Sequence, residues 1–129
     1  DKISFAPSFM ILVSPVVSMG KYAHAGSRKN LLGENPTLEL IEKYSLELQV
    51  TAKTPPCFLV GAFNDKSVHP SNSLRFYEAL LEKGVVTSFH VFPQGGHSIG
   101  VGNNPGSTAL WTPLCEEWMR EMGLIESMR

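Results

Sequence analysis

The sequence predicts an α/β fold with about three parallel strands, flanking helices and a helical insertion. Three short apolar runs predict the strands, and a long polar segment separates the first run from the second. An amphipathic helix joins the second run to the third, and strand–helix–strand units of this kind place their strands parallel. The chain has 129 residues, 43% of them hydrophobic, which suits one domain or part of one.

The first apolar run is SFMILVSPVV, residues 8–17, which Pro15 interrupts. It does not alternate polar and apolar positions, which is typical of a strand buried on both faces in a parallel sheet. The polar segment that follows contains two short stretches with helical character, 27–32 and 37–44. We interpret residues 27–50 as a helical insertion over the sheet, where long connections often form lids or binding surfaces.

The second run, CFLVGA at 57–62, is a second buried strand, and the third strand covers 85–92. Between them lies a helix at 71–84, which Gly84 ends as a C-terminal cap. The apolar side chains that we place on one face of this helix are Leu74, Tyr77, Leu80 and Leu81. Together these elements form a βαβ unit at 57–97 with parallel strands.

The last helix is expected from about 107 to 122. Thr112 and Pro113 offer a later start for it, as the N-cap and the first helical residue. Gly123 marks its end.

Composition narrows the classes of function. The net charge is −1 and no stretch concentrates basic residues, so nothing indicates nucleic-acid binding. No apolar run approaches the roughly 20 residues of a membrane span, and no compartment is indicated. Cys57 and Cys115 cannot build a disulfide framework, and we expect buried free thiols, with one disulfide or a nucleophilic role as alternatives. Neither has a neighbour at metal-ligand spacing, so we expect no metal and no cofactor.

Two titratable side chains follow neighbouring strands. Asp65 comes just after strand 57–62, and His97 lies in FPQGGHSIG, just after the third strand. The carboxyl ends of adjacent parallel strands lie side by side at one edge of a sheet, where such folds bind ligands. A carboxylate beside one ring nitrogen fixes the imidazole tautomer and leaves the other nitrogen to take a proton. We therefore predict an orienting acid and a general base.

Each of these residues also has an ordinary explanation. An Asp after a strand is often a turn or cap residue, and a lone His in a glycine-rich turn is often a surface residue. The catalytic interpretation is favoured because two strand ends must agree. His69 is the rival partner for Asp65, since it follows in the same loop. His24, in the polar segment that leads into the insertion, and His90, inside the third strand, are expected to have no catalytic role.

The stretch PPCFLVGAFNDKSVHPSNSLRFYEALLEKGVVTSFHVFPQGGHSIG resembles the C-terminal part of α/β-hydrolase esterases and lipases. The branch it resembles is the acetyl-esterase-like group of sugar or xylan esterases, akin to the prolyl-oligopeptidase-type hydrolases. That group carries an acidic loop similar to DKVVP, then ENSLxFYEAL, then GGHGFG. Asp65 matches the triad acid and His97 the triad histidine. His69, Asn64 and Ser98 depart from the group's usual residues, and none of them removes a triad group.

The resemblance implies that 1–129 is the C-terminal portion of one α/β-hydrolase domain whose nucleophile half lies upstream. Ser14 lacks the glycines of a G-x-S-x-G turn, and Ser98 directly follows His97, so neither matches the nucleophile. The implied activity is a carboxylic-ester hydrolase with a Ser–Asp–His triad and an acyl-enzyme mechanism. Its implied substrates are short acyl or acetyl esters, including esters on sugars. This chain would supply only the acid and the base, so we expect it to be inactive alone.

The resemblance also implies a partner. Without an upstream neighbour, the strand near 9–13 exposes an apolar edge, so we expect the chain to bind its missing half or to self-associate. One alternative is a non-catalytic α/β module that binds a small ligand or a partner protein; it predicts that Asp65 and His97 do not touch. The second alternative is a serine peptidase of the same superfamily, because ester and peptide hydrolysis share this half of the triad.

Overall fold

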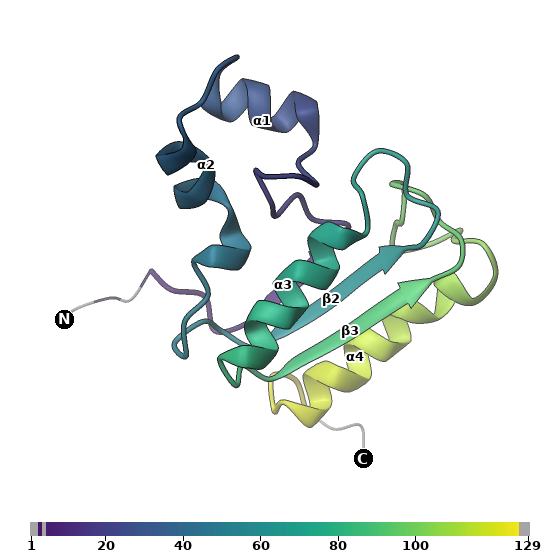
Figure 1. Cartoon of the computed structure of the whole chain (residues 1–129). Coiled ribbons are helices and arrows are strands. Elements are labelled where there is room, and N and C mark those ends of the chain that lie inside the picture. Colours follow the sequence, from purple (N-terminus) through teal and green to yellow (C-terminus); the bar gives the residue numbers. More distant parts are fainter. Residues whose placement is uncertain (1–2, 4, 127–129) are drawn as a thin grey trace.

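The computed structural model describes residues 3 and 5–126, so both ends of the predicted domain 1–129 extend beyond the described residues. It confirms the α/β class with a sheet of three parallel strands. Figure 1 labels the second and third strands and the helices around them. The strands are β1 (Met10–Val13), β2 (Cys57–Ala62) and β3 (Thr87–Phe92), in the spatial order β1-β2-β3. Because β2 and β3 are adjacent and parallel, the loops that follow them leave the sheet at the same edge.

Two helices cover opposite faces of the sheet (Figure 1). Helix α3 (Ser71–Glu82) packs on one face and helix α4 (Trp111–Glu121) on the other. Alternate residues of β2 supply the two cores, because successive side chains of a strand point to opposite faces. The core on the α3 face contains Val17, Val50, Cys57, Leu59, Phe76 and Leu80. The core on the α4 face contains Phe58, Val60, Phe92, Trp111, Cys115 and Trp118.

The buried face of α3 differs from the predicted one. Leu80 is fully buried as expected, but Leu74 and Leu81 are 46% and 64% exposed. Phe76 takes their place in the core, with Asn72 and Ser73 also buried. Positions 73, 76 and 80 follow the helical repeat as well as the leucines do. Periodicity alone therefore did not show which of two overlapping faces meets the sheet.

The first strand is shorter and more exposed than predicted. The run at 8–17 forms a strand only over Met10–Val13, and Ile11 is 37% exposed rather than buried. Among the described residues β1 pairs with β2 alone, so one side of β1 has no strand neighbour. The strand ends where Ser14 turns to a positive φ of 45° and Pro15, which has no amide proton, follows.

The insertion contains two helices, α1 (Ala25–Leu32) and α2 (Leu38–Tyr44), and a 3₁₀ turn, η1 (Leu46–Leu48). Helix α1 starts two residues before the predicted position because the His24 ring caps it by accepting the Ser27 amide proton. Neither α1 nor α2 has a buried residue, and η1 packs against α3. The role of 27–50 as a lid remains a prediction.

The last helix begins as a 3₁₀ turn, η2 (Gly106–Leu110), that runs into α4. The later start at Thr112 and Pro113 is wrong, because the N-cap of α4 is Leu110 and Pro113 lies inside the first turn, where a missing amide proton costs no hydrogen bond. Gly84 and Gly123 end their helices at φ values of 68° and 67°, as predicted. Within the described part of the chain, no helix is long and apolar enough to cross a membrane.

Candidate active site

Asp65 lies in the loop directly after β2 and is held there by its own side chain. Its Oδ1 accepts hydrogen bonds from the amides of Ser67 and Val68, each at 2.9 Å. Such side-chain-to-backbone bonds are how Asp residues organise turns. The residue is 7% exposed, so the carboxylate is nearly removed from water although it lies at the sheet edge.

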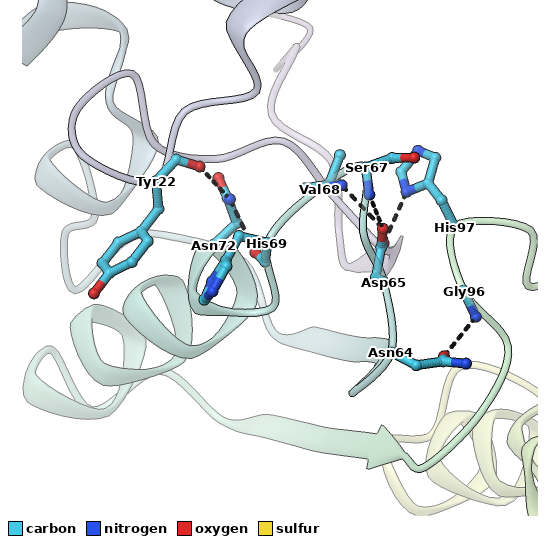
Figure 2. A network of polar contacts seen from close by, with 9 residues as sticks. All are labelled: Tyr22, Asn64, Asp65, Ser67, Val68, His69, Asn72, Gly96 and His97. Atoms are coloured by element: carbon cyan, nitrogen blue, oxygen red, sulfur yellow. Dashed lines mark hydrogen bonds and ion pairs between the residues drawn. The ribbon is translucent and has the colours of Figure 1, made fainter.

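His97 follows β3 and reaches Asp65 across the sheet edge, as Figure 2 shows. Its Nδ1 lies 2.9 Å from Asp65 Oδ2, although the residues are 32 positions apart in the sequence. The side chain of Asp65 is 3% exposed and that of His97 is 44% exposed. The pair thus has a buried acid and an accessible ring, as an orienting acid and a proton-transferring base require.

The protonation of the pair follows from the surroundings of Asp65. Burial raises the pKa of this carboxyl, but the hydrogen bonds from His97, Val68 and Ser67 and the charge of His97 lower it more, so its pKa lies below the ordinary value. Asp65 is therefore ionised at neutral pH and can only accept a hydrogen bond. The proton between the two side chains must then sit on His97 Nδ1, which leaves Nε2 unprotonated in the neutral ring.

The loop that carries His97 is fixed by three bonds that the sequence did not reveal. Asn64 Oδ1 accepts the Gly96 amide proton at 2.8 Å and ties this loop to the Asp65 loop (Figure 2). The buried Thr108 hydroxyl donates to the Gln94 carbonyl at 2.6 Å. Trp111 Nε1 donates to the Gly100 carbonyl at 2.7 Å, so the start of α4 anchors the far end of the loop.

Gly95 is required by the space around it. Its φ is +132°, and a Cβ there would lie 2.9 Å from Ile99 Cγ1 and 3.3 Å from Thr108 Cγ2. The next residue, Gly96, has a φ of +56°, but a Cβ there would have no other atom within 4 Å. The two glycines before His97 therefore serve different needs: Gly95 lets the loop pack closely, and Gly96 only permits the left-handed backbone.

The other three histidines have different partners. The ring of His69 stacks on Tyr22, with centroids 5.0 Å apart, and its Nδ1 accepts the Ser71 amide proton. The rival pairing of His69 with Asp65 is thus not the one in the structure. His24 caps α1, and His90 packs against Phe58, where burial lowers its pKa.

Asn72 is a second residue whose importance the sequence did not reveal. It is fully buried at the start of α3, and its Oδ1 accepts the amides of Val17 and Ser18 at 3.0 and 2.9 Å. Its Nδ2 donates to the carbonyls of Tyr22 and His69, as Figure 2 shows. One side chain thus joins the segment after β1 to the loop that carries Asp65.

The remaining reactive groups give no second centre. Cys57 and Cys115 are buried free thiols, as predicted, and burial raises the pKa of Cys57 to about 12 and also raises that of Cys115. No group of three potential metal ligands occurs among the described residues. An open cavity of about 430 Å³ lies beside Asp65, walled mainly by Phe63, Leu74, Phe89 and Val91, and His97 does not line it.

The fold and the Asp65–His97 pair together define the α/β-hydrolase class. A hydrogen-bonded acid and histidine at the carboxyl edge of adjacent parallel strands is the arrangement of that class. The non-catalytic alternative predicted that Asp65 and His97 do not touch, and their hydrogen bond contradicts that prediction. Residues 10–121 match the model of the prolyl oligopeptidase family, and the chain belongs to this family.

Similar proteins are esterases and hydrolases of carbohydrates. The chain is 44% identical over 102 residues to endo-1,4-beta-xylanase B of Butyrivibrio fibrisolvens, covering 79% of this chain and 16% of that protein. It is 30% identical over 122 residues to an acetylxylan esterase of Xylanibacter ruminicola, covering 91% and 24%. The crystal structure of an acetyl ester-xyloside bifunctional hydrolase from Caldicellulosiruptor lactoaceticus superposes with a TM-score of 0.90 at 42% identity, covering 93% and 44%.

The chain thus spans 16% and 24% of these two curated relatives and less than half of the solved one. It is a carbohydrate-esterase-like α/β-hydrolase chain, and its fold corresponds to part of the solved hydrolase.

Proposed function

We propose that this chain supplies the acid and the base of a Ser–Asp–His triad in a carboxylic-ester hydrolase, with the serine contributed by an upstream half. The observation that carries the proposal is the 2.9 Å contact between buried Asp65 and accessible His97. Ser14 lacks the flanking glycines of a nucleophile turn. Ser98 lies between Gly96 and Gly100, but it directly follows His97 in the loop after β3 and not at a strand-to-helix turn, so its hydroxyl cannot easily turn back onto that ring. The serine and the oxyanion donors therefore come from outside this chain.

In the proposed mechanism His97 Nε2 takes the proton of the serine as it attacks the ester carbonyl. Asp65 holds the ring in the Nδ1–H tautomer and stabilises the imidazolium that forms. His97 then returns the proton to the leaving alcohol, and a water molecule repeats the cycle on the acyl-enzyme. Positioned general-base catalysis contributes ~10²–10⁴-fold, and each oxyanion donor ~10²–10³-fold.

The proposed substrates are short acyl esters on sugars, above all acetyl esters on xylan or xylosides. The names of an acetylxylan esterase and of an acetyl ester-xyloside hydrolase among the relatives support this substrate class. A peptidase remains the competing activity, since the acid and the base are common to both reactions. The choice between them depends on the pocket around the upstream serine.

The test joins this chain to the N-terminal half of the Caldicellulosiruptor hydrolase, to which it is 42% identical. We expect the fusion to release acetate from acetylated xylo-oligosaccharides and to leave peptide amides intact. His97→Ala should reduce kcat by at least ~10³-fold in a protein that melts like the parent. A folded fusion that cleaves peptides faster than acetyl esters would contradict the proposed substrate, and full activity in His97→Ala would contradict the proposed base.

The chain alone should hydrolyse short acyl esters no faster than buffer does, because it lacks the proposed nucleophile and oxyanion donors. Hydrolysis by the 129-residue chain that disappears in His97→Ala would mean that the nucleophile lies within this sequence.

A further inference from the structure

Ser14, at the carboxyl end of β1, combines backbone strain with an unused polar group. Its amide donates to the Val60 carbonyl at 2.8 Å, which continues the pairing of β1 with β2. Its φ of 45° lies in the left-handed region, which a non-glycine residue occupies at a cost. The residue is 9% exposed, and its hydroxyl has no hydrogen-bond partner among the described residues. A buried hydroxyl without a partner is costly unless a bound molecule satisfies it.

The hydroxyl of Ser14 borders a small cavity that also touches the triad acid. Ser14, Gly61, Asp65 and Ser73 all line this cavity, which offers about 10 Å³ to the centre of a water molecule. That volume is about what one water needs, and buried waters usually make about three hydrogen bonds. Polar groups of the lining come from three parts of the fold: Ser14 directly after β1, Asp65 in the loop after β2, and Ser73 in α3.

Asp65 has room for one more hydrogen bond. A carboxylate presents about four acceptor positions. Two on Oδ1 are used by the amides of Ser67 and Val68, and one on Oδ2 by His97. The fourth acceptor position of the carboxylate has no hydrogen-bond partner among the described residues. Asp65 also lines the cavity. A water in the cavity would complete the set.

We infer that one water molecule occupies this cavity, accepts a hydrogen bond from the Ser14 hydroxyl, contacts the Ser73 hydroxyl and donates to Asp65 Oδ2. Ser14 is then a positioning residue that acts on the triad acid through this water. The inference rests on the proposed function for its catalytic meaning, while the site itself stands on the cavity and its hydroxyls. The strained backbone of Ser14 has a purpose in this account, because it places the hydroxyl at the cavity.

Three variants separate the water from the rest of the structure. Ser14→Ala removes the hydroxyl and keeps the strained backbone. Ser14→Gly removes the hydroxyl and relieves the strain. Gly61→Ala keeps both hydroxyls but fills the cavity, since a Cβ there would lie at ordinary contact distance, 3.8 Å, from Ser73 Oγ. Ser107→Ala, at an exposed serine that does not line the cavity, is the matched control.

The first readout is a high-resolution crystal structure of the chain, free or in the fusion, in which we expect a water within hydrogen-bond distance of Ser14 Oγ and Asp65 Oδ2. The second is the carboxyl-carbon NMR titration of Asp65. Loss of one hydrogen bond to the carboxylate should raise the proton affinity of Asp65 about tenfold in Ser14→Ala, Ser14→Gly and Gly61→Ala, and leave it unchanged in Ser107→Ala.

A dry cavity, or an Asp65 titration unchanged in both Ser14→Gly and Gly61→Ala, would overturn the inference. A purely structural role for Ser14 would change the melting temperature of its variants without moving that titration. If Ser14→Ala does not fold, Ser14→Gly and Gly61→Ala still decide the question. These results are independent of the proposed function, whose failure would appear as ester hydrolysis that persists in His97→Ala.

Discussion

Replacement of Asp65 by Asn in the fused enzyme is the sharpest perturbation of the site. The amide has the same shape, and its Oδ1 can keep the two 2.9 Å bonds from the Ser67 and Val68 amides, so the loop should stay in place. Its Nδ2, however, is a donor where the carboxylate was an acceptor. His97 can keep the 2.9 Å contact only by giving up the Nδ1 proton, which moves the proton to Nε2, the nitrogen that must accept from serine.

We expect Asp65→Asn to lower kcat by ~10⁴-fold with little change in KM, equivalent to about 5.5 kcal/mol of transition-state stabilisation. Initial rates on acetylated xylo-oligosaccharides measure this, and circular dichroism checks the fold. Asn64→Ala is the matched control in the same loop: it removes the exposed 2.8 Å bond to Gly96 and should cost about tenfold at most. Activity of Asp65→Asn within tenfold of the parent would refute the assigned role of Asp65.

Three further predictions concern stability and association. Because the pKa of Asp65 is lowered in the fold, its ionisation adds to the free energy of unfolding; this contribution is complete above pH 3.8 and is lost as pH falls through the lower folded-state pKa. Urea denaturation at several pH values should show this loss of stability in the parent chain and not in Asp65→Asn. Gly95→Ala should lower the free energy of unfolding by ~1–3 kcal/mol more than Gly96→Ala in the same assay. A Cβ at position 95 would lie 2.9 Å from Ile99 Cγ1, whereas a Cβ at position 96 would have no other atom within 4 Å; equal destabilisation by the two variants would contradict this explanation. In sedimentation, the isolated chain should self-associate through β1, and Ile11→Lys should weaken association; a monodisperse parent monomer would count against it.

The sequence predicted the strands and the pairing of Asp65 with His97 for the same physical reason. Buried strands such as Cys57–Ala62 require continuous apolar runs, and a crossover helix forces parallel neighbours. Once two strands are parallel and adjacent, the residues that follow them must meet at one edge. No knowledge of the loop paths was needed for that step.

What the sequence did not predict depends on loop paths and on choices between similar faces. The bonds from Asn64 to Gly96 and from Asn72 to four backbone groups join segments with no periodic relation to one another. The positive φ of Ser14 has no marker in its residue type, since serine rarely adopts it. The exposure of Leu74 was not predicted because the face of α3 that packs on the sheet includes buried Asn72 and Ser73, which an apolar pattern does not mark.

The central claim is that Asp65 holds His97 with its proton on Nδ1 and leaves Nε2 free to take a proton from a serine. Long-range ¹H–¹⁵N NMR correlation of the histidine rings in the 129-residue chain measures this for the neutral His97 ring. We predict a protonated Nδ1 and an unprotonated Nε2 for His97, with the tautomer reversed in Asp65→Asn. A proton on Nε2 in the parent chain, or the same tautomer in both proteins, would contradict the account.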